Sequence, residues 1–98
     1  MALKALVIHD KDNMCNLIGP GSKGDQVECD IAKASTETVT LLDDIPSNHK
    51  FARVDIKVGD TIYKYGMSIG KASKDIARGE YVHVHNIDSN YGRGHVKA

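Results

Sequence analysis

Short apolar runs separated by polar and turn-forming residues extend along the chain. The runs are rich in Val, Ile, Leu and Tyr, and none shows the apolar spacing of an amphipathic helix. Strands are therefore predicted at residues 4–9, 27–31, 39–42, 49–54, 61–65, 68–72 and 81–85. Residues 14–18 fit either a strand or one helical turn. The whole pattern predicts a mainly β, small single domain with little helix, built as a barrel or a clip of hairpins.

One short motif occurs three times in the second half of the chain. It reads Asp-Ile, two variable residues, then Gly or Asn, at residues 44–48, 55–59 and 75–79. Ile can anchor a turn to the core, and Gly or Asn tolerates the positive φ that such a turn needs before the next strand. By contrast, residues 19–25 read as a loop without the spacing of a phosphate-binding loop. Residues 32–37 are polar and show no clear period.

The predicted strand at 81–85 carries the most suggestive polar pattern. Its alternation places Val82 and Val84 on one face and Tyr81, His83 and His85 on the other. Two imidazoles on one face can converge on a metal ion or an anionic substrate. The alternative is that both histidines are merely solvated on an exposed face.

Composition narrows the class of protein. The 98 residues suffice for one domain, predicted at 1–88, with a Gly-rich flexible tail at 89–98. The 13 basic and 13 acidic side chains balance, so neither nucleic acid nor an anionic membrane is an expected partner. Cys15 and Cys29 form no disulfide framework, and the apolar start of the chain is too short for a signal peptide or membrane span. A cytoplasmic location is expected.

Several motifs, in order, resemble one family. They are Asp-Ile-Pro-x-x-His-Lys-Phe-Ala at 44–52, Asp-Ile-x-x-Gly at 55–59, Ile-x-Lys-Tyr-Gly at 62–66, Ile-Gly-x-Ala at 69–72, Asp-Ile-x-x-Gly-Glu at 75–80 and Val-His-x-His-Asn at 82–86. Together they resemble the SAF-type domain of altronate and galactarate dehydratases and the alpha subunit of sulfolactate sulfo-lyase. Asp12-Asn13 and Arg93-Gly94 fit the same pattern. The loop at 19–25 departs from it, and Asn48 stands where Gly is usual.

The resemblance implies a β-clip fold of the SAF type and a role in a lyase. It suggests the small subunit of a metal-dependent sugar-acid dehydratase, which completes an active site on a separate large catalytic subunit. The expected cofactor is a divalent metal (Fe²⁺, Mn²⁺ or Mg²⁺) shared with that subunit. Because the chain stops at Ala98, the large part would be a separate polypeptide, unless the chain is a fragment. The alternatives are a sulfolactate sulfo-lyase alpha subunit and a non-catalytic carbohydrate-binding module; self-association is left open.

Five residues of two motifs are the first candidates for the site. His83 and His85 are expected as metal ligands or proton carriers, because imidazole can serve in both roles. Asn86 is expected to ligate through its amide oxygen or to bind a substrate hydroxyl. His49 and Lys50, on one turn, are expected to act in catalysis as a cationic pair that meets the substrate carboxylate.

Two further cations are candidates for substrate binding. Lys64 lies on a predicted strand, and its alternative is an exposed face. Arg93, between two glycines, can clamp a carboxylate with both of its terminal nitrogens, and its alternative is a place in an unstructured tail.

Overall fold

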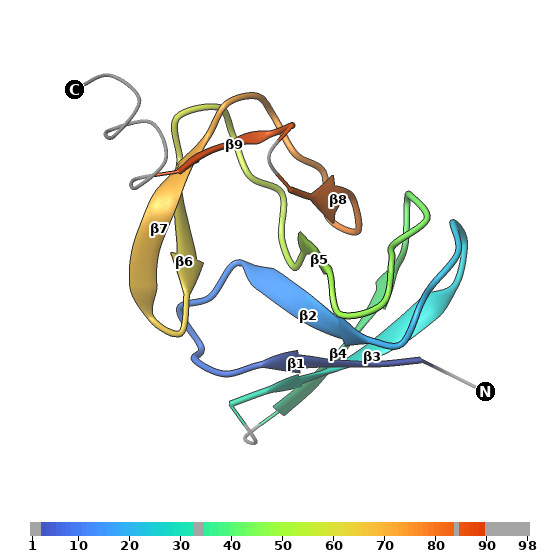
Figure 1. Ribbon diagram of the computed structural model, residues 1–98. Helices are drawn as coiled ribbons and strands as arrows, with labels where there is room; N and C mark the ends of the chain where they lie inside the picture. Colours follow the sequence, from blue (N-terminus) through green and yellow to red (C-terminus); the bar gives the residue numbers. More distant parts are fainter. Residues whose placement is uncertain (1–2, 33–34, 84, 90–98) are drawn as a thin grey trace.

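Strands and tight turns form the fold. A computed structural model describes residues 3–32, 35–83 and 85–89, and these contain no helix, as Figure 1 shows. No helix with the length and apolar character needed to cross a bilayer occurs in that part of the chain. The strands are β1 (Leu3–Val7), β2 (Met14–Ile18), β3 (Gln26–Ile31), β4 (Ser35–Thr40), β5 (Lys50–Ala52), β6 (Thr61–Lys64), β7 (Met67–Ala72), β8 (Tyr81–Val82) and β9 (Ile87–Ser89). The mainly β prediction is confirmed, and residues 14–18 form a strand.

Two sheets share the strands. The first has six strands in the order β4-β3-β1-β2-β5-β8, and the second has three in the order β6-β7-β9. Neighbours run antiparallel except β1 and β3, which are parallel. Figure 1 shows the second sheet at one end of the molecule and strands β1, β3 and β4 at the other. Strands β2, β5 and β8 lie between these ends.

Two hydrophobic cores meet at strands β2 and β5. Cys15 and Phe51 point into the first core, among β1 to β5, whereas Met14 and Ala52 point into the second, beneath β6 and β7. This division follows from the alternation of side chains along a strand. The thiols of Cys15 and Cys29 are free and buried in the first core, with their sulfurs 3.2 Å apart.

The three predicted turns form as the motif requires. Their isoleucines are each at most 2% exposed, and their last residues all have positive φ: Asn48 (64°), Gly59 (89°) and Gly79 (91°). The motif also has a role for its first residue. Asp75 Oδ1 accepts the backbone N–H of Val58, and Asp55 Oδ1 accepts that of Arg78, each at 2.9 Å. The second and third turns therefore bind each other reciprocally.

The loop at 19–25 contains a fourth turn of the same kind. Gly24 has a φ of 94°, and Asp25 Oδ2 accepts the N–H of Ser22 at 2.9 Å. Asp60, directly after the second motif, likewise accepts the N–H of Lys57 through Oδ2 at 2.9 Å. The backbone of this loop pairs with the first motif, so the loop follows the repeat in geometry although its sequence departs from it.

Several strand predictions need correction: residues 4–9 and 49–54 form shorter strands at 3–7 and 50–52, and β9 was not predicted. The largest differences concern the strands predicted at 39–42 and 81–85. Strand β4 covers residues 35–40 rather than 39–42, because it lies at the edge of the first sheet and buries only Val39 among its side chains. An edge strand with one buried position shows no apolar alternation in its sequence. The strand predicted at 81–85 ends at Val82. Its partner β5 begins at Lys50, opposite Val82, so the ladder has no partner beyond that point. The end of β9 takes the first residue of the predicted tail, and residues 90–98 lie outside the described part.

Candidate functional site

Four rings gather where β5 begins and β8 ends. The ring centroid of His49 lies 5.9 Å from that of Tyr81 and 5.4 Å from that of His83. Tyr81 stacks on His83 at 5.7 Å and lies 5.5 Å from His85. His49 and Tyr81 are half-buried, whereas His83 and His85 are exposed. We call these four residues the imidazole cluster; it unites the three histidines that the sequence singled out.

A turn, rather than a strand, places the exposed histidines. Asn86 is fully buried, and its Oδ1 accepts the backbone N–H of His83 at 3.0 Å. Its Nδ2 donates to the carbonyl oxygen of Tyr81 at 2.8 Å, and its own N–H donates to the carbonyl of His83 at 3.1 Å. Both ends of the Asn86 amide are thus occupied by the backbone. Asn86 thus closes the turn beneath the cluster, and its predicted contact with substrate or metal stays a prediction.

The His49 ring contacts the backbone through its Nδ1. Its Nδ1 lies 3.0 Å from the carbonyl oxygen of Ser47. A carbonyl oxygen can only accept a hydrogen bond, so Nδ1 carries the proton in this contact. Nε2 of the neutral ring then keeps its lone pair, available to a proton or a metal ion.

The described residues do not by themselves form a complete metal site. Among the described residues, no group of three or more His, Cys, Asp and Glu side chains is placed to hold a metal ion. Imidazole nitrogen suits first-row transition metals, yet protein metal sites usually draw on three or more ligands. The described residues therefore fit a divalent metal only as a partial ligand set.

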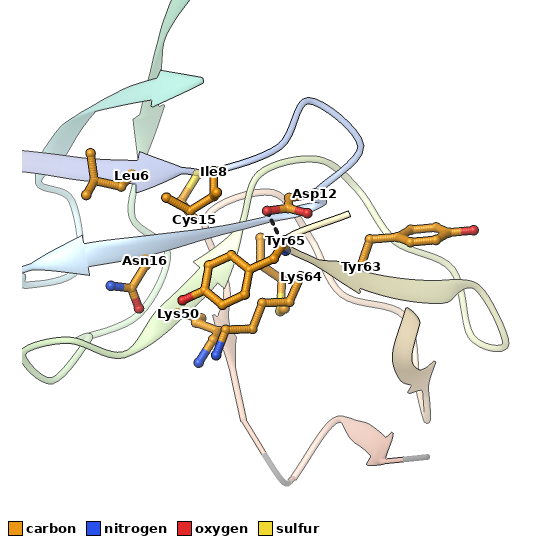
Figure 2. A pocket seen from close by; sticks show the side chains of 10 residues that line it. Leu6, Ile8, Asp12, Cys15, Asn16, Lys50, Tyr63, Lys64 and Tyr65 are labelled. Carbon is orange, nitrogen blue, oxygen red and sulfur yellow. Dashed lines mark hydrogen bonds between the residues drawn. The ribbon is translucent and has the colours of Figure 1, made fainter. Parts of the chain in front are cut away.

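Lys50 and Lys64 lie together in a pocket on the other face of β5. The pocket has a volume of about 110 Å³. It is lined by Leu6, Ile8, Asp12, Met14, Cys15, Asn16, Lys50, Tyr63, Lys64 and Tyr65. Figure 2 shows the two ammonium groups ending close together, with the Tyr65 ring beside them. The Lys64 ammonium lies 5.1 Å from the centroid of that ring. Lys50 thus lies with Lys64 in this pocket, whereas His49 belongs to the imidazole cluster; their predicted joint contact with a substrate carboxylate stays a prediction.

The charge environment of Lys50 is unfavourable to its protonated form. Burial lowers the pKa of Lys50 from its ordinary value, and the neighbouring Lys64 ammonium lowers it further. The ion pairs formed among the described residues include neither lysine.

Asp12 and Asn13 fasten the β6–β7 hairpin to the first sheet. Asp12 accepts the backbone N–H groups of Tyr65 at 2.9 Å and Gly66 at 2.7 Å, and Figure 2 marks the bond to Tyr65. Asn13 Oδ1 accepts the N–H of Tyr63 at 3.0 Å, and its Nδ2 donates to the carbonyl of the first residue of β6 at 2.9 Å. These bonds fix the hairpin that carries Lys64. The sequence showed Asp12-Asn13 as a motif without indicating this role.

The structure places the described candidate residues in two separate locations. His49, His83 and His85 share the imidazole cluster, Lys50 and Lys64 share the pocket, and Asn86 lies beneath the cluster. Arg93 lies outside the described residues. Sequence reasoning missed Asn16 and Tyr65 as pocket residues. For Tyr65 a partial signal existed, since Gly66 between two predicted strands indicates a turn there.

Comparisons with known proteins give one family-model match and several similar proteins. The family model "Altronate/galactarate dehydratase SAF domain" matches residues 3–90. The altronate dehydratase of Escherichia coli (strain K12) is 39% identical over 88 residues, which are 90% of this chain and 17% of that enzyme. The altronate dehydratase of Bacillus subtilis (strain 168) is 40% identical over 83 residues, 85% of this chain and 16% of the enzyme.

A third relative is of similar size to this chain. The (2R)-sulfolactate sulfo-lyase subunit alpha of Chromohalobacter salexigens is 32% identical over 84 residues, which are 83% of this chain and 89% of that subunit. The chain thus spans nearly all of this subunit but about a sixth of the altronate dehydratases. With the family model matched over most of its length, the chain belongs to the SAF-domain family of altronate and galactarate dehydratases.

Proposed function

We propose that this chain is the SAF component of a hydroxy-acid lyase and that it completes the active site of a large catalytic subunit. The preferred reaction is loss of water from a sugar acid. Support comes from the relatives, which are altronate dehydratases and a sulfo-lyase subunit. The near-complete coverage of the sulfo-lyase alpha subunit supports a separate small subunit as the form in which the chain works.

The observation that carries the proposal is the orientation of the His49 ring. Dehydration of a hydroxy acid needs a base for the proton on the carbon beside the carboxylate, and an acid for the departing hydroxyl. With Nδ1–H held by the Ser47 carbonyl, His49 Nε2 is left to accept a proton, and His83 lies against the same ring. His49 would take the proton as the C–O bond breaks. A protonated His83 or His85 would deliver one to the hydroxyl, which leaves as water.

A divalent metal shared with the large subunit is the alternative to a protonated histidine at this cluster, because an imidazole nitrogen that binds a metal ion carries no proton. His83 and His85 are exposed, so a docked subunit can add ligands around them. Fe²⁺ and Mn²⁺ match imidazole better than Mg²⁺, which prefers oxygen. When bound, such an ion would polarise the leaving hydroxyl. Asn86 would hold the two histidines in place through the turn that it closes.

A second candidate function is loss of sulfite from sulfolactate. The match to the sulfo-lyase alpha subunit covers both chains almost end to end, which favours it. The same cluster would serve, because elimination beside a carboxylate needs the same base and only the leaving group differs.

The test is co-expression with the large lyase subunit of the same genome. The purified complex is assayed with altronate, galactarate and sulfolactate in the presence of Fe²⁺, Mn²⁺ or Mg²⁺. His49→Gln and the double variant His83→Ala/His85→Ala are compared with Lys74→Gln, a change at an exposed position away from the cluster. Co-elution of the subunits is measured for every variant.

We expect the assembled complex to turn over one of the substrates, and the product decides between water and sulfite. His49→Gln should lower kcat by about a hundredfold or more, as loss of a general base does, without loss of assembly. The Lys74 variant should match the wild type. Full activity in assembled His49→Gln would remove the proposed role of the cluster, and failure of the two subunits to associate would favour a carbohydrate-binding module.

A further inference from the structure

The pocket that contains Lys50 and Lys64 is separate from the imidazole cluster. In the ladder between β5 and β8, Lys50 lies opposite Val82 and Phe51 lies opposite Tyr81. Val82 belongs to the second core, whereas Tyr81 packs against the first. Since paired residues point to the same face of a sheet, Lys50 and the cluster residue Tyr81 point to opposite faces.

The lining of the pocket leaves a positive charge without a matching anion. Two lysines and one aspartate among the lining residues give a net charge of one positive unit. The Asp12 carboxylate is 5% exposed, and both of its oxygens accept backbone N–H groups of the β6–β7 hairpin. The two ammonium groups repel each other, and an anion placed between them would relieve that repulsion.

The shape of the pocket restricts what such an anion can be. Its volume of about 110 Å³ exceeds the ~10–15 Å³ that one water needs, but is below the ~300 Å³ at which pockets for whole small-molecule ligands begin. It therefore admits one end of a small molecule. Leu6 and Ile8 form an apolar wall, and Asn16 adds an amide that can bind a hydroxyl.

We propose that this pocket binds the carboxylate of a small hydroxy acid, with Lys50 and Lys64 as the binding pair and Asn16 beside the hydroxyl. Each ammonium donates to a different carboxylate oxygen, and Tyr65 covers the site. The choice of a hydroxy acid rests on the proposed function; the carboxylate site does not. Because the pocket and the imidazole cluster lie on opposite faces of β5, the bound molecule is held apart from the reacting histidines. The site thus acts in recognition or regulation.

The first test uses the chain alone, with glycolate as the probe. Amide resonances are followed by ¹H–¹⁵N NMR during titration, with glycolamide as the neutral analogue of the same shape. Glycolate should shift the resonances of Asn16, Lys64 and Tyr65, and glycolamide should not. The side-chain ¹³C signal of Lys50 should report a pKa that rises on glycolate binding, because the anion favours the charged lysine.

Variants separate this site from general attraction of anions to a protein surface. Lys50→Gln and Lys64→Gln should each weaken glycolate binding by about tenfold, as expected for loss of a charge-assisted hydrogen bond. Lys74→Gln removes an equal charge from an exposed position and should leave binding unchanged. Circular dichroism confirms that each variant is folded. Equal shifts with glycolamide, or equal effects of all three substitutions, would overturn the proposal.

The assembled complex distinguishes a free ligand from a carboxylate side chain of the catalytic subunit. If the pocket takes a free hydroxy acid, Lys64→Gln lowers glycolate affinity in the complex while the subunits still co-elute. If Lys64→Gln instead abolished assembly and left glycolate binding unchanged, the two lysines would bind a carboxylate of the catalytic subunit, and the proposal would be wrong. Glycolate binding at the lysines in an inactive complex would overturn the lyase function alone, whereas an active complex without such binding would overturn this site alone.

Discussion

Replacement of Asp12 by Ala should loosen the β6–β7 hairpin from the first sheet. The turn of this hairpin has positive φ at Tyr65 (55°) and Gly66 (77°), the conformation of the tight two-residue hairpin turn. A bulky residue such as Tyr pays about 1–2 kcal/mol for that conformation. The Asp12 carboxylate holds the turn by accepting both of its N–H groups, with a longer bond of 3.4 Å from the N–H of His9.

The expected loss follows from these bonds. A hydrogen bond to a charged group contributes about 1.5–3 kcal/mol, and the exposed Tyr65 lets water replace part of it. Two short bonds therefore predict a decrease of about 2–4 kcal/mol in the free energy of unfolding. This is a large share of the ~5–15 kcal/mol available to a domain of this size. Asp12→Asn keeps one acceptor oxygen and should lose about half as much.

Urea unfolding followed by far-ultraviolet circular dichroism measures the difference. Asp10→Ala is the matched control, because the Asp10 side chain is 83% exposed and contacts only the half-exposed ring of His9 among the ion pairs found. It should change stability by less than about 0.5 kcal/mol. If Asp12→Ala were as stable as Asp10→Ala, the carboxylate would not be what fastens the hairpin.

Three further outcomes are expected. Gly79→Ala should lower the free energy of unfolding by well over the ~1–2 kcal/mol of a positive-φ alanine, because its Cβ would lie 2.2 Å from the Thr40 carbonyl oxygen. Gly59→Ala has a similar φ and open space around its Cβ, so it should lose only that ~1–2 kcal/mol. Equal urea midpoints of the two variants would contradict this prediction. Asn86→Ala should lower the free energy of unfolding by about 2–4 kcal/mol, since two buried bonds are lost, and should broaden the histidine NMR signals of the cluster; unchanged stability would refute its positioning role. Lys50→Met should remove a rise in stability with pH. Burial, and then the neighbouring Lys64, lower the pKa of Lys50 in the folded protein below the ordinary 10.5. Between the folded pKa and 10.5 the unfolded chain binds more protons than the folded chain, so the wild-type free energy of unfolding increases with pH. Urea unfolding from pH 7 to 11 measures this, and the same pH dependence in wild type and Lys50→Met would exclude it.

The turns show how much of the structure can be predicted from local sequence. A motif of Asp, Ile and a terminal Gly or Asn encodes a buried anchor and a positive φ, and both are properties of a few neighbouring residues. The three turns therefore form where the motif predicts them. The loop at 19–25 makes the same turn without the Asp-Ile start, because pairing with the first motif supplies what its sequence lacks. The motifs also predicted the family, and the comparisons confirm that prediction.

The candidate site depended on contacts that no local pattern contains. The alternation of apolar and polar residues correctly predicted that the two kinds of side chain lie on opposite faces of a strand. The length of β8, however, was set by where its partner β5 begins. Because the ladder ends there, the chain turns after Val82, Asn86 is buried, and the His83 ring lies against that of His49. The same pairing separated Lys50 from His49 and placed it beside Lys64, which lies on another sheet.

The sequence by itself therefore determined the β class, the turn positions and the family, because each rests on residues close together in the chain or on motifs in a fixed order. Only the tertiary structure decided which candidate residues share a site. Strand ends and side-chain partners depend on segments that are distant in sequence, and their pairing is fixed when the two sheets pack.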